Sequence, residues 1–387
     1  MIRVSIIGSY NYKALIMILV ALVFCTGLLA SPAAASARGQ EVHLVPAVYV
    51  FGDSTVDVGN NQYLPGNSAL QLPYGIDFPH SRPTGRFSNG YNVADFVAKL
   101  VGFKRSPPAY LSLTPRMSSQ IFRGFRGANY ASGGSGILDT TGNSITLTKQ
   151  IEYFAATRSK MLAINSGAAD ELLSKSLFLI SDGGNDLFAF LSQNRTASEV
   201  PSLYADMLSN YTRHIATLYS LGARRLGIVD VAPIGCVPAI RVTSPDGEHK
   251  CVESANALAR GFNNALRSLL ANLTSSSSSS GSGNGNKLPG LRYSVGSSYN
   301  VVSYFTAHPA AAGFRDVASA CCGGGRLNAQ TGCTPNATYC GNRNDHLFWD
   351  AVHGTQATSR KGAAAIFYAP VATGFATPIN FKQLVSS

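Results

Sequence analysis

The chain has 387 residues, of which 45% are hydrophobic and 13% charged, and a formal net charge of +11 at pH 7. This length is sufficient for one large domain with a full hydrophobic core. Lysines and arginines are scattered in runs no longer than two, which argues against a nucleic-acid-binding protein and favours a basic surface that could attract an acidic extracellular polymer.

The N-terminal segment has the features of a secretory signal peptide. Arg3 and Lys13 precede the apolar run ALIMILVALVFCTGLLA at 14–30, and the small residues that follow offer a cleavage site after Ala37. An uncleaved membrane anchor is the alternative, because the apolar run is only slightly shorter than a bilayer-spanning helix. We expect cleavage, which would leave a single secreted domain at 38–387 without a stable membrane anchor.

Beyond the leader, short apolar runs alternate with helical patterns, which predicts a parallel β-sheet covered by helices on both faces. The first expected strand is AVYVF at 47–51. A helix is expected to begin at the capping residue Asn92, with the apolar residues of NVADFVAKLVGF on one face. The run GANYASGG at 127–134 predicts a short strand that leads into a Gly-rich loop.

Two further apolar runs, at 176–186 and 225–235, predict buried strands that end in Gly-containing loops. Ligand sites in open α/β sheets collect where strands end, so these loops are the expected location of a functional site. The helical segment ESANALARGFNNALRSLLANL is followed by a Ser- and Gly-rich insertion at 274–287. This composition cannot bury apolar surface and predicts a flexible surface loop within the same domain.

Cysteines and glycosylation sequons both agree with export. One of the seven cysteines lies in the leader, and the even number that remains predicts disulfide bonds: Cys236, Cys251, Cys321, Cys322, Cys333 and Cys340. The spacing leaves their pairing open, although adjacent cysteines are not expected to bridge each other. A zinc site is the competing use of the last four, but no Cys-x-x-Cys pair is present. Asn-x-Ser/Thr sequons occur at Asn194, Asn210, Asn272 and Asn336.

A serine nucleophile is suggested where the first apolar run stops at Gly-Asp-Ser. The hydroxyl of Ser54 would need a base to remove its proton and a carboxylate to orient that base. Among the seven histidines, His353, in FWDAVHGT, has an acid three residues before it and follows the apolar residues Phe348 and Trp349, as if from a buried strand. One turn could therefore place the carboxylate of Asp350 beside imidazole Nδ1 and leave Nε2 free for Ser54.

Donors for a negatively charged carbonyl oxygen are also available. A backbone N–H in the Gly-rich loop, at Gly133, and the side-chain amide of Asn185, at a strand end, suit this purpose. The lipase-type G-x-S-x-G elbow, H-E-x-x-H, G-x-G-x-x-G and the P-loop are all absent from the sequence, so zinc hydrolysis and nucleotide binding lose their main support.

These motifs resemble, in order and over nearly the whole chain, the plant GDSL esterase/lipases, a branch of the SGNH hydrolases. FGDSTVDVGNN is similar to the first family block, GANYASGGSGI to the second, GGND to the third and DAVH to the last. The resemblance implies a three-layer α/β/α sandwich with a flavodoxin-like parallel sheet. It also implies a role for each matching residue. Ser54 would be the nucleophile, with Asp350 as the acid and His353 as the base. The N–H of Ser54 would stabilise the oxyanion together with Gly133 and Asn185, and Gly183 matches the glycine of the third block.

The sequence departs from the family pattern at two positions. Thr55 stands where the family usually has Leu, and Gly354 stands where it usually has Pro after the histidine. Glycine at that position would loosen the backbone beside the base and could reduce activity. Gly133 and Gly134 are adjacent in the second block, so a shift of the alignment by one residue would give the role of oxyanion donor to Gly134.

The sequence therefore predicts a secreted carboxylic ester hydrolase of the cell wall or apoplast, acting through a Ser-His-Asp triad and an acyl-enzyme, without metal or organic cofactor. Lipid acyl esters are the favoured substrates, and the oligomeric state is left open. Three alternatives remain: an acyltransferase or polyester synthase using the same triad, a deacetylase of acetylated polysaccharide, and a non-catalytic secreted glycoprotein that binds wall polymers.

Overall fold

A computed structural model of the protein describes residues 43–65, 70–193, 195–244, 250–275 and 287–386. The expected signal peptide, the sequon at Asn194 and most of the Ser/Gly insertion lie outside the described residues. Among the helices that the described residues form, none combines the length and apolar character that crossing a bilayer requires.

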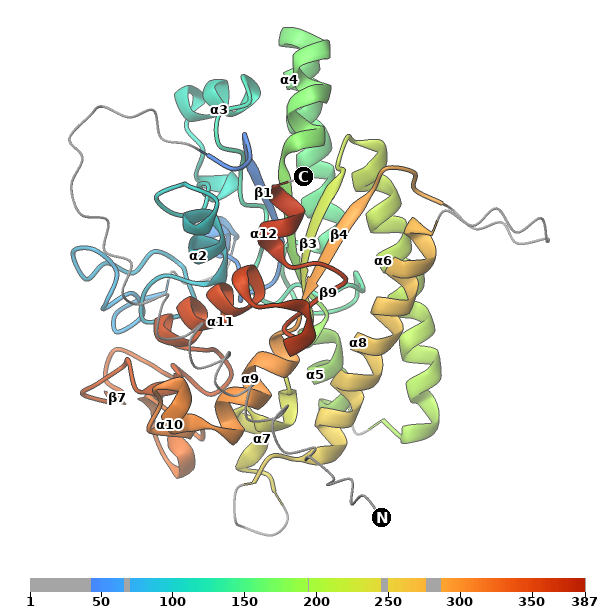
Figure 1. The fold of residues 1–387 in the computed structure, drawn as a ribbon. Coiled ribbons are helices and arrows are strands. Elements are labelled where there is room, and N and C mark those ends of the chain that lie inside the picture. Colours follow the sequence, from blue (N-terminus) through green and yellow to red (C-terminus); the bar gives the residue numbers. More distant parts are fainter. Residues whose placement is uncertain (1–42, 66–69, 194, 245–249, 276–286, 387) are drawn as a thin grey trace, which may run out of the picture.

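A five-stranded sheet in the order β1-β2-β3-β4-β9 forms the centre of the molecule (Figure 1). Its first four strands are parallel: β1 (Val48–Gly52), β2 (Leu177–Ser181), β3 (Arg225–Val229) and β4 (Arg292–Gly296). Every residue of β1 and β2 is buried, as expected for strands covered on both faces. The last strand, β9 (Ala376–Thr377), is antiparallel to β4, which is a departure from the all-parallel prediction.

The segment predicted as a strand near residue 127 does not form a regular strand, but it pairs with the free side of β1 through isolated parallel bridges. The amides of Val48 and Val50 donate to the carbonyls of Arg126 and Ala128, both at 3.1 Å, and the amide of Tyr130 donates back to Val50 at 2.8 Å. The segment at 126–130 therefore lies at the edge of the sheet, next to β1 and on the side opposite β2. This is the position of the second strand in the flavodoxin-like order. The α/β fold class predicted from the sequence is confirmed.

Helices cover both faces of the sheet. One face packs on α4 (Leu147–Lys175), α6 (Val200–Ser220) and α8 (Glu253–Thr274); the other packs on α2 (Val93–Leu100), α9 (Ser298–Ala307), α11 (Gln356–Tyr368) and α12 (Phe381–Val385). Figure 1 shows α6 and α8 beside one face and α2, α11 and α12 on the other. Because side chains alternate along a strand, Tyr49 and Phe51 enter the first core and Val48 and Val50 enter the second.

Shorter elements complete the chain: η1 (Asn60–Tyr63), η2 (Tyr110–Ser112), α3 (Pro115–Phe122), α5 (Gly184–Ser192), η3 (Ala197–Glu199), η4 (Ile234–Cys236), α7 (Pro238–Arg241), α10 (Pro309–Ala312), β5 (Asp316–Ala320), β6 (Cys322–Gly323), η5 (Arg326–Asn328), β7 (Thr338–Tyr339), β8 (His346–Phe348) and η6 (Val371–Thr373). The predicted cap of α2 is confirmed, because the Asn92 side chain accepts from the amide of Asp95. Helix α4 is interrupted at Asn165, which has φ −160° and ψ 101°.

Three disulfides join the six cysteines that remain beyond the leader. They pair Cys236 with Cys251, Cys321 with Cys340, and Cys322 with Cys333. As predicted, the adjacent cysteines do not bridge each other. Instead, each is bonded to a cysteine in the segment that follows, Cys333 or Cys340. Cys321 and Cys322 pack against the fully buried Trp349, so the crosslinks fix the segment that immediately precedes Asp350.

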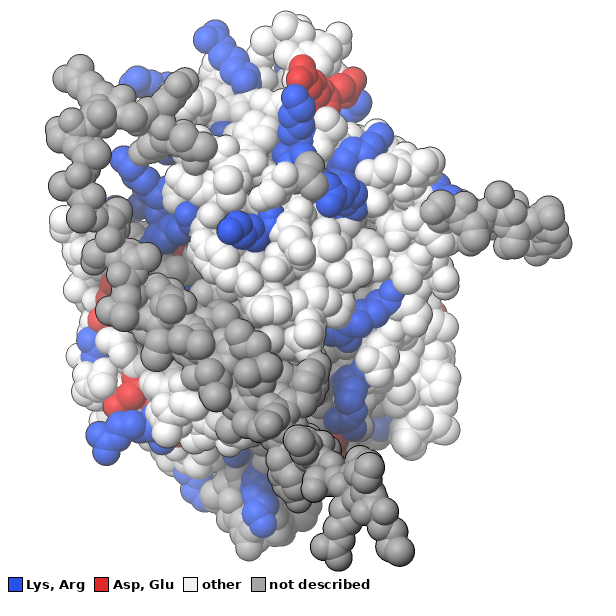
Figure 2. All heavy atoms as spheres, in the orientation of Figure 1, with Lys and Arg blue, Asp and Glu red and all other residues white. Residues whose placement is uncertain are grey.

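The surface agrees with the scattered charge seen in the sequence. Figure 2 shows lysine and arginine side chains spread over one face, with uncharged residues between them and fewer acidic side chains. Two of the described sequon residues, Asn272 and Asn336, are exposed, and Asn210 is partly exposed. Their glycosylation stays a prediction.

Candidate active site

The apolar run of β1 stops at Gly-Asp-Ser because the chain turns sharply there. Gly52 has φ +128°, and a Cβ atom at this position would lie 1.9 Å from the carbonyl oxygen of Ser181. Only glycine fits such an approach. The turn continues as Oδ1 of Asp53 accepts the N–H of Thr55 at 2.9 Å and its hydroxyl at 2.6 Å. Ser54 is thereby presented at the carboxyl end of the sheet.

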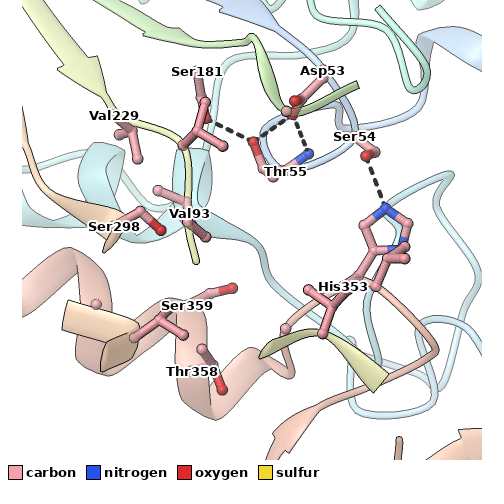
Figure 3. A pocket seen from close by; sticks show the side chains of 18 of the residues that line it. Asp53, Ser54, Thr55, Val93, Ser181, Val229, Ser298, His353, Thr358 and Ser359 are labelled. Atoms are coloured by element: carbon pink, nitrogen blue, oxygen red, sulfur yellow. Dashed lines mark hydrogen bonds between the residues drawn. The ribbon is translucent and has the colours of Figure 1, made fainter. Parts of the chain in front are cut away.

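The C-terminal motif reaches Ser54 from the other end of the chain. Directly after β8, the amide of Trp349 donates to the carbonyl of His353 at 2.7 Å and closes a turn. Within this turn His353 Nδ1 lies 2.8 Å from Oδ2 and 3.0 Å from Oδ1 of Asp350. His353 Nε2 lies 2.8 Å from Ser54 Oγ. Figure 3 marks this hydrogen bond with a dashed line. The structure thus brings together the three residues that the sequence predicted as a triad.

Asp350 is held by more than the imidazole. Its Oδ1 accepts the amides of Val352 at 3.0 Å and His353 at 2.8 Å, which fixes the carboxylate plane. Its Oδ2 accepts the hydroxyl of Tyr74 at 2.7 Å. Tyr74 also packs edge-on against Trp349, with ring centroids 6.1 Å apart. Sequence reasoning missed Tyr74, because nothing in PYGIDFP connects it to a residue so distant in the chain.

The charges of the pair can be assigned from their surroundings. Burial alone would raise the pKa of Asp350, but the charge and hydrogen bond of His353, with the two backbone amides, outweigh it and lower that pKa. Burial alone would lower the pKa of His353, but the charge and hydrogen bond of Asp350 and the charge of Asp53 raise it. An ionised Asp350 therefore increases the basicity of the imidazole.

The expected donor at Gly133 is placed differently from the prediction. Its N–H donates to Oδ2 of Asp57 at 3.0 Å, so this amide is already used inside the fold. The next residue, Gly134, has φ +89° and lines the cavity beside Ser54. In the described part of the chain, the amides of Ser54 and Gly134 have no hydrogen-bond acceptor. The amide of Gly133 is thus bonded within the fold, whereas the amides of Ser54 and Gly134 remain available beside the cavity.

Asn185 lies in the first turn of α5 and lines the same cavity. Its side-chain amide donates to the carbonyl of Ser135 at 2.7 Å. A carboxamide nitrogen carries two hydrogens, so one remains for a ligand. Gly183, the residue before this helix, has φ +111°, a conformation that glycine adopts without strain. The GGND motif thus turns the chain at the end of β2 and positions Asn185.

Three other aspartates gather near the site, and sequence reasoning did not single them out. Burial, followed by the charges of Asp53 and Asp186, raises the pKa of Asp182 well above its usual range. Burial also raises the pKa values of Asp53 and Asp186. Within the described ranges, no group of three or more His, Cys, Asp or Glu side chains is arranged to hold a metal ion.

Both departures from the family pattern lie in hydrogen-bonded positions. The Thr55 hydroxyl, besides donating to Asp53, lies 2.8 Å from the hydroxyl of Ser181 (Figure 3). The carbonyl of Gly354 accepts from the hydroxyl of Ser88 at 3.3 Å, and the next amide, of Thr355, donates to Leu347 at 3.0 Å. The backbone after His353 is therefore held by hydrogen bonds where proline would have restrained it.

A cavity of about 380 Å³ opens at Ser54 and His353. Beyond Ser54 and His353 its walls are mainly apolar and come from α2, β3, α9, β8 and α11, including Val93, Val229, Val301, Phe305, Leu347 and Ile366. Its volume is within the range of small-molecule sites. The arrangement combines a hydroxyl, an imidazole, a carboxylate and unpaired amides at one end of an apolar cavity.

Comparison with known proteins gives consistent matches. The family model described as GDSL-like Lipase/Acylhydrolase matches residues 48–366. Two Arabidopsis thaliana proteins, GDSL esterase/lipase At5g55050 and GDSL esterase/lipase At1g71250, are each 37% identical to this chain. The first alignment covers 89% of this chain and 90% of the relative, and the second 88% and 89%. A solved lipase from a goat rumen metagenome aligns with 85% of this chain and 97% of its own, at 12% identity and a TM-score of 0.35.

Proposed function

We propose that this chain, which belongs to the GDSL-like lipase/acylhydrolase family and is a carboxylic ester hydrolase, cleaves esters through Ser54, His353 and Asp350. The observation that carries the proposal is the hydrogen-bonded series from Ser54 Oγ to His353 Nε2, at 2.8 Å, and from His353 Nδ1 to Asp350 Oδ2, at 2.8 Å. Geometry of this kind activates a serine that is otherwise a weak nucleophile.

The reaction follows from these positions. Ser54 Oγ attacks the ester carbonyl carbon while His353 Nε2 takes the hydroxyl proton, and Asp350 stabilises the imidazolium that forms. The tetrahedral intermediate then expels the alcohol, which receives that proton from His353, and leaves an acyl-enzyme. Water, deprotonated by His353, attacks the acyl-enzyme and releases the carboxylic acid and free Ser54.

The developing oxyanion would be stabilised by the N–H groups of Ser54 and Gly134 and by the second amide hydrogen of Asn185. Each donor of this type contributes about 3 kcal/mol to lowering the barrier. The unpaired amides of Ser54 and Gly134 support this assignment, and the hydrogen bond from the Gly133 amide to Asp57 favours Gly134 over Gly133 as the donor.

Lipid acyl esters are the substrates that the cavity favours. An apolar cavity extending from Ser54 gives favourable burial to an acyl chain, and an acetyl group would leave most of it unfilled. This supports lipid esters over acetylated polysaccharide. Secretion is part of the same proposal, because three disulfides persist in an oxidising compartment and the sequence begins with signal-peptide features.

Ester hydrolysis by purified protein tests the proposal. The wild-type protein should hydrolyse p-nitrophenyl esters and release one acid for each alcohol, while Ser54→Ala should abolish turnover. Ser192→Ala, an exposed serine on α5, is the matched control and should retain it. Turnover that survives Ser54→Ala would refute the assignment of the nucleophile.

A further inference from the structure

A second hollow in the surface, the α3 groove, lies outside the active site. It has a volume of about 900 Å³ and is bounded by η1, by α3, whose position Figure 1 shows, and by the segments at 82–86, 103–109 and 125–127. The described residues that line it include none that line the cavity at Ser54. Phe87 directly follows the first of these segments and lines the cavity at Ser54, so the two spaces are neighbours with separate walls.

The α3 groove is basic. Five of the described residues that line it carry a positive charge and none is acidic: Arg82, Arg86, Lys104, Arg105 and Arg126. The charge of Arg86 is compensated by Asp95, to which its Nε donates at 2.7 Å and its Nη2 at 2.8 Å. Arg82, Arg105 and Arg126 are exposed, and none of them forms an ion pair with a residue that the structure describes. Charges of one sign that gather in a hollow attract an oppositely charged partner.

The turn at 125–127 holds one of these guanidinium groups in place. The amide of Gly127 donates to the carbonyl of Phe125 at 2.9 Å, and the carbonyl of Arg126 accepts from the amide of Val48 in β1 at 3.1 Å. Arg126 has φ +67°, a left-handed conformation that favours glycine. Its guanidinium carbon lies 5.0 Å from the centre of the Phe125 ring. A stacked guanidinium keeps its N–H groups available, so this turn presents a positioned anion-binding group.

Aromatic rings stand beside the guanidinium groups. Phe125 and Tyr63, the last residue of η1, are each 55% exposed, and both line the α3 groove. Two exposed rings in one hollow point to a ligand that has apolar faces of its own. A sugar ring has such a face, formed by its C–H groups, and a uronic acid adds a carboxylate that a guanidinium binds with two parallel hydrogen bonds. The combination fits a polymer of acidic sugars.

We propose that the α3 groove binds an acidic polysaccharide at a site separate from the triad. The guanidinium groups of Arg82, Arg105 and Arg126 bind its carboxylates. The rings of Tyr63 and Phe125 pack on the apolar faces of its sugars. Nucleic acid is the other polyanion that arginines and aromatic rings bind. The choice of polysaccharide rests on the secretion proposed above, because an exported chain meets extracellular polymers. Binding in the groove retains the enzyme on the polymer while the active site stays open to esters.

Binding to polygalacturonate tests the proposal. Isothermal titration calorimetry at low salt would use the Ser54→Ala protein, so that no ester is hydrolysed during the titration. The ligands are polygalacturonate, the same polymer with its carboxyl groups reduced to alcohols, and single-stranded DNA. Polygalacturonate should bind at least about tenfold more tightly than the reduced polymer, and its affinity should fall as salt is added.

Variants in the same background locate the site. Replacing the three arginines together, by Arg82→Gln, Arg105→Gln and Arg126→Gln, should weaken polygalacturonate binding by about tenfold and reduce its salt dependence. Replacing the two rings, by Tyr63→Ala and Phe125→Ala, should also weaken binding but leave the salt dependence unchanged, because no charge is removed. Circular dichroism should show the parent fold in both variants.

The matched control removes the same net charge from exposed positions outside the groove, by Arg326→Gln, Arg360→Gln and Lys382→Gln together, and should bind as tightly as the parent. An equal loss in the control and in the arginine variant would overturn the proposal, because net charge alone would then explain binding. Absence of binding, equal binding of the reduced polymer or tighter binding of single-stranded DNA would also overturn it. None of these results bears on ester hydrolysis, which the turnover of the wild-type protein tests separately.

Discussion

Asp350, which is bonded to His353, and Asp182, which lines the cavity, are equally buried, each 6% exposed, yet their pKa values move in opposite directions. Asp350 faces the imidazole of His353 and accepts two backbone amides, so its carboxylate form is stabilised. Asp182 accepts the amide of Gly183 and the hydroxyl of Ser135, but its charged neighbours are other aspartates. Burial alone therefore does not set the charge of a carboxyl group; the partner does.

The largest expected effect is the loss of kcat when Asp350, the carboxyl group with the lowered pKa, is replaced. Asp350→Asn removes the charge that stabilises the imidazolium and favours the wrong tautomer of His353. We expect kcat to fall by about 10⁴-fold, as a Ser-His-Asp mechanism requires. Steady-state kinetics with p-nitrophenyl butyrate would measure it, and a loss of less than about tenfold would mean that Asp350 is not the orienting acid.

The next effect concerns the oxyanion side of the site. Asn185→Ala removes a side-chain donor and should lower kcat by about 10²-fold with little change in KM. Circular dichroism should show an unchanged fold, because Asn185 is partly exposed. An unchanged kcat would show that the amide of Asn185 does not contact the developing charge.

Tyr74 provides a smaller effect on the same carboxylate. Tyr74→Phe keeps the ring against Trp349 and removes only the hydroxyl that donates to Asp350. We expect kcat to fall by about tenfold, since one hydrogen bond to a charged group is lost. Without this donor the charge on Asp350 is less stabilised, so the kinetic pKa of His353 should move upward; a purely structural role would leave that pKa unchanged.

The pH dependence follows from the raised pKa of His353. The base must be neutral, so kcat/KM should rise with pH and level off above the His353 pKa, which lies above the ordinary value of 6.5. Protonated His353 also stabilises the folded protein. This contribution to the free energy of unfolding is fully present below pH 6.5 and is lost as the pH rises through the folded-state pKa of His353. Asp350, with its lowered pKa, stays ionised over this range. A profile that falls as pH rises from 6 to 8 would contradict this assignment.

The smallest expected effect is on Asp182, whose pKa is raised by burial and by the charges of Asp53 and Asp186. Asparagine closely resembles a neutral carboxylic acid, so Asp182→Asn should change the free energy of unfolding by no more than about 1 kcal/mol. Its kcat should stay far above that of Asp350→Asn. Equal losses in the two variants would show that both carboxyl groups are ionised and would remove the contrast between them.

The sequence alone predicts the triad because its members carry local signals. The apolar run ends at Ser54, and Asp350 and His353 share one turn. Other features depend on contacts that no local pattern records. Gly133 and Gly134 are adjacent residues of the same type, and only the fold determines where the amide of each one points. The contact between Tyr74 and Asp350 joins residues that are 276 positions apart in the sequence.

The same distinction holds for the fold. The buried strands are predictable because apolar runs such as VYVFG are covered on both faces. The strand β9 is not, because it has two residues and its direction is set by the antiparallel pairing of Val295 with Thr377 and of Gly296 with Ala376. The disulfide pairing is likewise a property of the folded chain, since the spacing of the cysteines allows several pairings.

The central claim is that Ser54 is reactive because His353 takes its proton. A fluorophosphonate probe tests this most directly, since it labels an activated serine covalently. Mass spectrometry of the labelled wild-type protein should find the probe on the peptide that contains Ser54, and the labelling rate should collapse in His353→Ala. Labelling that persists in Ser54→Ala, or that proceeds at the wild-type rate in His353→Ala, would contradict the account.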